Sequence, residues 1–163
     1  MTSLTISAGT FNAGANTIAV TGDLTGAGTF TASSATTTVG GNFSPTSFNA
    51  NGGTMVFDTT ANSAITTTVG AYNNVSLSAA KRPTAGTLTI NGTLGLTAAG
   101  VLDLATNNAA LSVAGPTTNG GTITGGSGAL TFNGTVTTSG TITGGSGALT
   151  FGNDATDQVT NTG

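Results

Sequence analysis

The sequence predicts an all-β protein, a parallel β-solenoid (β-helix) of about 19 residues per coil and eight to nine coils. The main observation is an internal repeat: the segment from Gly121 to Phe132, GTITGGSGALTF, returns unchanged from Gly140 to Phe151. Such a short period is typical of small stacked units, none of which buries its apolar face alone. Helical apolar spacing is nearly absent, whereas short alternating runs bounded by Gly, Asn and Ser occur throughout.

The expected strands are short runs that are too small for a sandwich but suit the faces of a coil. Gly and Asn between them are expected to turn the corners, because these residues accept a positive φ most readily. In chain order the runs are Leu4 to Ile6, Thr17 to Val20, Gly28 to Thr31, Thr37 to Val39, Thr54 to Asp58, Asn74 to Leu77, Thr87 to Ile90, Thr93 to Leu96, Val101 to Leu104, Leu111 to Val113, Thr122 to Thr124, Ala129 to Phe132, Thr135 to Thr137, Thr141 to Thr143 and Ala148 to Phe151.

A row of apolar residues with the same step predicts the core of the solenoid. Counting back from the end of the second repeat in steps of nineteen reaches apolar residues at nearly every position. Residues two apart in a strand point to the same side, so Leu130 is expected inside with Phe132, and Thr131 outside. At one place the row slips by one residue, because Phe57 suits the core better than Val56. The predicted core ladder is Val56 or Phe57, Val75, Leu94, Val113, Phe132 and Phe151.

The chain carries unusually little charge. Charged residues make up 4% of the sequence, against about 25% in an ordinary globular protein. Only Lys81 and Arg82 are basic, so no nucleic-acid partner is expected, because such binding needs many basic contacts to phosphate. No run of about eighteen apolar residues occurs, and therefore no membrane insertion is expected.

The sequence offers little that could catalyse a reaction or bind a metal ion. It contains no His, Cys or Glu, and its five Asp residues are scattered apart from Asp154 and Asp157, which are interpreted as part of a solvated turn. The GGSG segments resemble the start of a calcium-binding repeat, but Leu130 and Leu149 stand where that repeat has its carboxylate ligand. The sequence therefore predicts a protein that is not an enzyme and has no metal site and no cofactor.

Repeated Thr-Ile-Thr runs form a first set of candidate contact residues. They would place two rows of hydroxyl groups on one outer face, the arrangement of an ice-binding solenoid. The competing interpretation is that Thr is simply a favoured polar residue of an exposed strand. The four side chains of this predicted array are Thr122, Thr124, Thr141 and Thr143.

A second set of candidate contact residues lies near the middle of the chain. Most of the Phe residues have the spacing of a core ladder, but Tyr72 precedes two Asn residues and is expected at a corner with its hydroxyl in water. The segment Lys81-Arg82-Pro83 breaks the alternating pattern, so residues 79–86 are predicted to form a projecting loop. Tyr72, Lys81 and Arg82 are therefore candidate residues for contact with a glycan or a cell-surface protein.

The run from Gly52 to Leu104 resembles the repeats of a known group of proteins. Its pattern TLTINGTL followed by VLDL is similar to the Thr- and Gly-rich repeats of large secreted bacterial surface proteins, the filamentous-haemagglutinin-like and autotransporter-like adhesins. The resemblance implies a right-handed parallel β-helix located outside the cell or on its surface. The secretion cap of that family is not recognisable at the N-terminus, which is expected of an interior segment or of a different export route.

The ends of the predicted solenoid favour one function over the others. Residues 1–163 are expected to form a single domain or a segment of a longer solenoid, with no helix or charged segment to cap its first and last coils. Uncapped coils expose strand edges that recruit another chain, and the low charge does little to oppose association. The sequence therefore predicts a non-enzymatic structural protein, part of an extracellular fibre, stalk or surface filament, which stacks end to end on further copies or adjoining solenoid segments. The alternatives are an adhesin module and an ice-binding protein.

Overall fold

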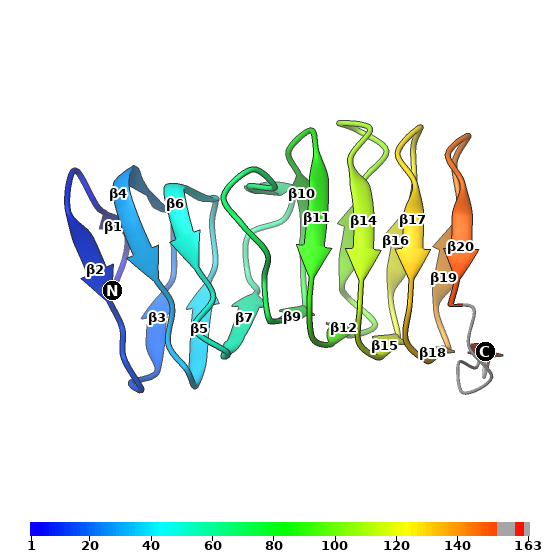
Figure 1. The fold of residues 1–163 in the computed structure, drawn as a ribbon, viewed down its shortest axis with the longest axis horizontal. Helices are drawn as coiled ribbons and strands as arrows, with labels where there is room; N and C mark the ends of the chain where they lie inside the picture. The colour runs from blue at the N-terminus through cyan, green and yellow to red at the C-terminus, as the bar shows by residue number, and fades with distance from the viewer. Residues whose placement is uncertain (153–158, 162–163) are drawn as a thin grey trace.

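The computed structural model of the chain describes residues 1–152 and 159–161. It is a parallel β-solenoid of about eight coils stacked along one axis, with the N-terminus at one end (Figure 1). The front strands in Figure 1 run downward while the coils advance from left to right, which makes the solenoid right-handed. The fold class predicted from the sequence is confirmed. Within the described ranges the chain forms no helix, and hence none long and apolar enough to span a membrane.

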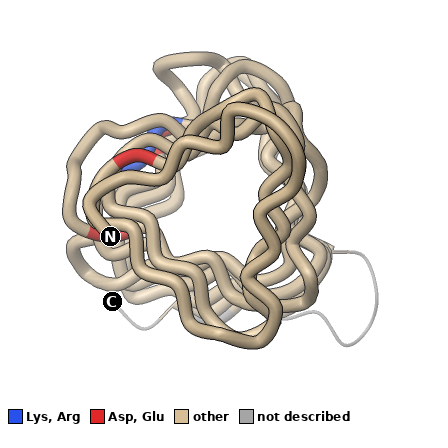
Figure 2. The backbone as a smooth tube through the Cα atoms, turned by 90° about the vertical axis from the view of Figure 1, so that its left-hand side faces the viewer, with Lys and Arg blue, Asp and Glu red and all other residues tan. Residues whose placement is uncertain are grey.

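Three parallel sheets form the faces of the tube, which encloses its interior when seen along the axis (Figure 2). Sheet A contains nine strands: β1 (Leu4–Thr5), β2 (Thr10–Asn12), β4 (Leu24–Thr31), β6 (Phe43–Asn49), β8 (Ser63–Ile65), β10 (Ala80–Pro83), β13 (Val101–Asp103), β16 (Thr122–Thr124) and β19 (Thr141–Thr143). Sheet B contains eight: β3 (Ile18–Val20), β5 (Thr36–Val39), β7 (Thr54–Phe57), β9 (Asn74–Leu77), β12 (Leu94–Leu96), β15 (Thr117–Asn119), β18 (Val136–Thr138) and β21 (Val159–Asn161). Sheet C contains four: β11 (Thr87–Ile90), β14 (Ala110–Val113), β17 (Leu130–Phe132) and β20 (Leu149–Phe151).

The first coils use longer strands than the last ones. Strands β4 and β6 each turn a corner of the tube, so that their first parts lie with β1 and their second parts lie with β2. The face formed by β2 and these second parts continues into sheet C through Tyr72. The ring of Tyr72 packs next to that of Phe48 in β6, and Tyr72 forms an isolated parallel bridge with Ile90 in β11. One continuous face therefore runs from β2 to β20.

Alternation within each strand decides which side chains fill the tube. In β14, Leu111 and Val113 are buried while Ser112 lies on the outer side. β17 repeats this pattern one coil later, with Leu130 and Phe132 buried. Each fully buried aliphatic or aromatic side chain contributes roughly 1.5–3 kcal/mol, and the interior of the tube forms one connected core.

The predicted core ladder divides between two sheets. Val113, Phe132 and Phe151 stack on one another in sheet C. Val75 and Leu94, in contrast, stack on one another in sheet B. All five face the interior, but the single row that a constant step of nineteen predicts does not exist.

A long corner accounts for the break in the row. Residues 105–108 form a turn between β13 and β14 and lengthen their coil. Val113 consequently pairs with Ile90, twenty-three residues earlier. Counting back by nineteen from Val113 therefore crosses from one face of the tube to the next.

The orientation of side chains in β7 shows which of Val56 and Phe57 belongs to the core. Phe57 is buried and pairs with Leu77, whereas Val56 lies half-buried on the outer side. The expected link from Phe57 to Val75 is wrong, because Val75 pairs with Met55 instead. The core ladder thus includes Phe57 and not Val56.

Residues 79–86 do not form a projecting loop. Within them, Ala80–Pro83 is the strand β10, which pairs with β8 on one side and with β13 on the other. Lys81 and Pro83 are buried, and Arg82 points to the outer side. The prediction was wrong because charge interrupts the apolar pattern here, although the alternation of side chains between the two faces continues.

Glycine at the corners of the repeat allows successive coils to approach closely. A Cβ atom at Gly121 would overlap the carbonyl oxygen of Gly100, and one at Gly140 would overlap that of Gly121. The glycines with positive φ lie earlier in the chain, from Gly9 to Gly86. In the repeat, glycine is therefore required by the space between coils and not by the φ angle that the sequence suggested.

Candidate functional site

The described residues form no enclosed site. No pocket is found among residues 1–152 and 159–161. No group of three or more Asp, Glu, His or Cys residues gathers in the same ranges. Asp154 and Asp157, the close acidic pair of the sequence, lie outside the described residues. The candidate sites are therefore surfaces and strand edges.

Tyr72 lies inside the tube, and its prediction as a surface contact is wrong. Its ring centroid lies 4.9 Å from that of Phe48, and 5.9 and 6.3 Å from those of Phe43 and Phe57. The hydroxyl group donates a hydrogen bond of 2.7 Å to the backbone oxygen of Thr66. Burial raises the pKa of Tyr72 well above its usual value, because the charged phenolate would lose its water.

Lys81 is also buried, so it cannot be the exposed contact that the sequence predicted. Its Nζ atom donates hydrogen bonds to the backbone oxygens of Gly40 at 2.8 Å and Thr60 at 2.9 Å, and to Ser63 Oγ at 2.6 Å. Gly40 follows β5, Thr60 follows β7 and Lys81 lies in β10, so the ammonium group connects three successive coils. The side chain acts as an internal cross-link of the stack.

The environment of Lys81 disfavours its charge. Burial lowers the pKa of Lys81 to about 8, while the carboxylate of Asp58 acts in the opposite direction. A neutral amine could still donate to Gly40 and Thr60, and it could accept a hydrogen bond from the hydroxyl of Ser63 if that hydroxyl turned away from the backbone oxygen of Thr60, to which it donates at 3.0 Å. The site therefore tolerates either protonation state.

Arg82 remains accessible, although it is engaged by a neighbour. Its Nε atom lies 3.1 Å from Asp103 Oδ2, and the two side chains are 40% and 21% exposed. Asp103 also accepts hydrogen bonds from the backbone and hydroxyl groups of Thr106, at 3.0 and 2.6 Å. Partial burial alone would raise the pKa of Asp103, but the hydrogen bonds from Thr106 and Arg82 outweigh it and lower the pKa. The pair joins β10 to β13 on the outer side of sheet A.

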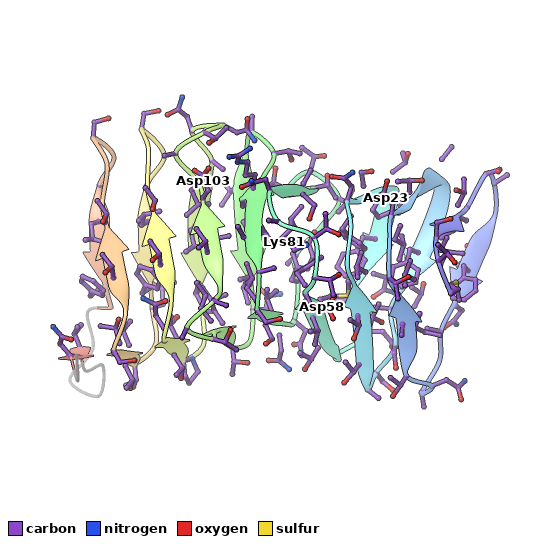
Figure 3. All side chains as sticks on the ribbon, turned by 180° about the vertical axis from the view of Figure 1, so that it is seen from behind. Asp23, Asp58, Lys81 and Asp103 are labelled. Carbon is purple, nitrogen blue, oxygen red and sulfur yellow. The ribbon has the colours of Figure 1, made fainter. Side chains whose placement is uncertain are left out.

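The charged side chains of residues 1–152 and 159–161 lie on one side of the solenoid. All charged side chains of the described residues belong to sheet A or to the corner that leads into it (Figures 2 and 3). They are Asp23, Asp58, Lys81, Arg82 and Asp103. The strands of sheets B and C carry none, so two of the three faces are neutral and rich in hydroxyl groups.

The four predicted Thr residues lie in register on sheet A. Thr122 pairs with Thr141 and Thr124 pairs with Thr143, and the two residues of β19 are the more exposed. The rows do not continue into the preceding coil, because Val101 and Asp103 occupy those positions. A longer hydroxyl row follows the outer side of sheet C; its outward orientation was predicted, but the row was not among the predicted contact residues. It comprises Thr89, Ser112, Thr131 and Thr150.

The last coil ends in three strands that each pair with one other strand among the described residues. β19, β20 and β21 are the terminal strands of sheets A, C and B. Leu149 is 41% exposed and Val159 is 55% exposed, although their counterparts one coil earlier, Leu130 and Val136, are fully buried. Ile142 and Phe151 remain partly buried against the core. The end of the tube is an apolar surface bordered by free strand edges.

The first coil ends in the same way. β1, β2 and β3 each pair only with the following coil. Leu4, Phe11 and Ile18 point inward and are partly buried. Met1 is 55% exposed. Among the described residues, the exposed large apolar side chains are Met1, Leu149 and Val159. The exposed large apolar side chains thus all belong to the two terminal coils.

Sequence reasoning identified the open ends but missed the roles of Tyr72 and Lys81. Spacing could have indicated the place of Lys81, since Leu102 and Ile123 follow it at intervals of twenty-one residues and face the interior. Tyr72 could have been recognised because it stands eighteen residues before Ile90. Both signals depend on coil lengths other than nineteen.

The fold defines the class of this protein as a parallel β-solenoid repeat protein. Comparisons of the chain with protein-family models, with curated proteins and with solved structures found no significant match. The function is therefore argued from the geometry of the solenoid and its ends.

Proposed function

We propose that this protein is a non-enzymatic structural protein, a β-solenoid unit of an extracellular fibre, stalk or surface filament that assembles by end-to-end stacking of strands. The observation that carries the proposal is the exposure of apolar side chains at both ends, next to strand edges that have no partner in the described chain. A free edge with apolar side chains is a template for pairing with another chain.

The rest of the molecule is consistent with a structural role. Its outer faces consist largely of Thr, Ser and Asn. The phenol of Tyr72 and the amine of Lys81 are buried and form hydrogen bonds inside the tube. Coaxial stacking would extend the same ladders that hold each coil to the next, so that a fibre needs no additional kind of interaction.

The extracellular location is part of the same proposal. It is supported by the resemblance of the run from Gly52 to Leu104 to the repeats of filamentous-haemagglutinin-like and autotransporter-like surface proteins. The parallel β-solenoid fold agrees with the architecture that the resemblance implies. In a longer surface protein, the same ends would stack on adjoining solenoid segments.

Electron microscopy of the purified chain at rising concentration tests the assembly. We expect filaments whose mean length grows with concentration, with sedimentation velocity recording the same growth in solution. Short rods of one length at every concentration would contradict end-to-end stacking.

A charge at one end provides a matched pair of variants. Val159→Lys places an ammonium group at the inward register position of β21, and we expect it to abolish filaments, because inward charge at a free edge opposes pairing. Thr137→Lys adds the same charge on the exposed outer side of β18, one coil earlier, and should leave assembly intact. Equal assembly of the two variants would show that the ends are not the contact surface.

A second candidate function, ice binding, is favoured by the hydroxyl rows on sheets A and C. The register of Thr122 with Thr141 and of Thr131 with Thr150 places hydroxyl groups at the strand spacing of about 4.8 Å. Thermal hysteresis of the purified chain tests it. A signal that Thr141→Val and Thr143→Val together remove would support this function, and the absence of hysteresis in the unaltered chain would reject it.

A further inference from the structure

We infer that each open end binds the opposite end of a second copy in one defined register, in which β1 pairs with β19, β2 with β20 and β3 with β21. The inference rests on the proposed function, since it specifies the partner and the geometry of the end-to-end contact. Each of the three faces of the tube would then continue across the junction with parallel strands.

The face that contains sheet C determines the register most clearly. Phe132 and Phe151 stack with ring centroids 5.5 Å apart, and Phe11 and Phe30 stack with centroids 6.0 Å apart. In both pairs the two residues are direct partners in the register of the strands. Phe151 of one copy on Phe11 of the next would join the two stacks into one row of four rings.

Sheets A and B supply apolar residues at the same junction. On sheet A the register of the chain brings Leu4 over Gly144, with Ile142, the last inward apolar side chain of β19, two residues before it. On sheet B, Val159 lies in register with the buried Val136, and Ile18 occupies the corresponding position in β3. Two faces of the junction would therefore place apolar side chains directly on apolar side chains, and on the third Leu4 would lie diagonal to Ile142.

The corners of the two end coils match closely in length. Leu4 and Phe11 are seven residues apart, as are Gly144 and Phe151. Phe11 and Ile18 are seven apart, against eight for Phe151 and Val159. Within the chain, Leu24 and Phe30, the partners of Leu4 and Phe11, are separated by six residues. Corners of unequal length thus already lie on one another within the chain. Only the strands need to keep their register across the junction.

Neither terminal coil carries a charged side chain in its described residues. The charged residues of the described chain lie from Asp23 to Asp103. The amino group of Met1 donates a hydrogen bond of 2.8 Å to the backbone oxygen of Ala19. No like-charge repulsion between described side chains therefore opposes the contact of one end with the other.

Disulfide mapping tests the register directly, because the native chain contains no cysteine. In the inferred register Thr10 lies opposite Thr150 of the next copy, with Cα atoms about 4.8 Å apart, within the span of about 4.4–6.8 Å that a disulfide bridges. Both residues are exposed on the outer side. The variant that combines Thr10→Cys with Thr150→Cys is expected to form a ladder of covalent multimers on non-reducing gels.

A second pair on another face tests whether the stacking is coaxial. The partners of sheet A, followed from Leu4 through Leu24, Phe43, Ile65 and Pro83, lead to the position of Gly144, so Ser3 would lie opposite Thr143 of the next copy. Both residues are exposed. Ser3→Cys with Thr143→Cys should give the same ladder. The first and last coils lie at opposite ends of the rod (Figure 1), so the two cysteines of one copy cannot form either disulfide with each other.

Shifted and single variants serve as controls. Asn12→Cys with Thr150→Cys places the thiols two residues out of register and should give no ladder, because the diagonal exceeds the span of a disulfide. The single variant Thr150→Cys can form disulfide-linked dimers, but it cannot form larger covalent multimers.

The possible outcomes separate the register from the proposed function. Filaments of the native chain together with a ladder from the shifted pair, or from neither pair, would overturn the register and leave end-to-end assembly standing. Filaments that link only through the Thr10 pair and not through the Ser3 pair would overturn coaxial stacking on all three faces. A native chain that never assembles would overturn both.

Discussion

The coils between Gly121 and Phe151 stack with a constant step, whereas the coils between Phe43 and Pro83 vary in length. In the first region, β16, β17 and β18 pair with strands nineteen residues earlier or later. In the second region, Phe43 pairs with Ile65 twenty-two residues later, and Ile65 pairs with Pro83 after eighteen.

The two regions also fill their interiors differently. The regular coils use aliphatic residues with Phe132 and Phe151, and glycine corners that bring the backbones together. The irregular coils contain a cluster of rings that are in mutual contact and a buried lysine. The cluster comprises Phe30, Phe43, Phe48, Phe57 and Tyr72.

This difference shows that constant coil length is not a condition of stacking. A coil of any length can join the solenoid if three short strands keep their register and the corner between them expands. Large side chains then fill the space that an irregular corner leaves, because voids in a core cost stability.

A buried charge in the regular region should have the largest effect. We expect Val113→Asp to destabilise the solenoid by more than about 4 kcal/mol, because an unpaired carboxylate would lie among apolar residues. The measurement is thermal unfolding followed by circular dichroism. Ser112→Asp is the control, since this side chain lies on the outer side of the same strand. An unchanged melting temperature for Val113→Asp would contradict its position in the core.

Truncation of a ring in the irregular region should have the next largest effect. Phe57→Ala is expected to cost about 3–5 kcal/mol, because Phe57 is fully buried and contacts the rings of Phe43 and Tyr72. Val56→Ala, one residue earlier on the outer side, should cost less than about 1 kcal/mol. Chemical denaturation measures both values. Equal losses from the two variants would mean that β7 does not have the register described.

The same contrast explains how much of the fold could be predicted from the sequence. The repeat and the alternating pattern predicted a solenoid correctly, because in the regular region period, alternation and turn residues agree. Five strands were not predicted, β2, β6, β8, β15 and β21, and β10 was predicted to be a loop. In β6 and β8, Pro45 and the Thr-rich segment after Ile65 mask the alternation. In β15 no apolar residue marks the inward side. A fixed period cannot locate strands where corner lengths vary.

The roles of individual side chains were harder to predict than the strands. Lys81 and Arg82 are neighbours with opposite orientations, one in the core and one beside Asp103. Charge alone suggested that both were exposed. What decides their positions is register: Lys81 lies opposite Ser63 and within reach of two carbonyl groups from earlier coils.

Glycine substitutions should sharpen the comparison with a moderate effect. Gly121→Ala is expected to destabilise the solenoid by about 1–3 kcal/mol, because the added methyl group meets the backbone of Gly100. Gly95→Ala adds the same methyl group where no atom lies nearby, and should stabilise the chain by about 0.4–1 kcal/mol. Urea unfolding compares the two. Similar changes in both variants would show that successive coils are not in close contact at Gly121.

The pH dependence of stability tests the buried lysine of the irregular region. The folded chain holds the proton of Lys81 less tightly than the unfolded chain, because burial lowers the pKa from 10.5 to about 8. Between these values the unfolded chain binds more protons, so the free energy of unfolding should rise with pH from about 8 upward. Above about pH 10, Tyr72 acts in the opposite direction, since its pKa is raised in the folded chain. Urea unfolding from pH 7 to 10 isolates the contribution of Lys81.

Lys81→Met is expected to have only a small effect at neutral pH. It removes a buried charge and keeps a side chain of similar length, so the free energy of unfolding at pH 7 should change by less than about 1.5 kcal/mol. The carbonyl of Gly40 keeps its hydrogen bond from Thr60 N, and that of Thr60 keeps its bond from Ser63 Oγ, so neither carbonyl is left without a donor. The rise in stability between pH 8 and 10 should disappear in this variant. A rise that persists would assign the titration to another group, and a large loss at pH 7 would mean that the three hydrogen bonds of the ammonium group outweigh its burial.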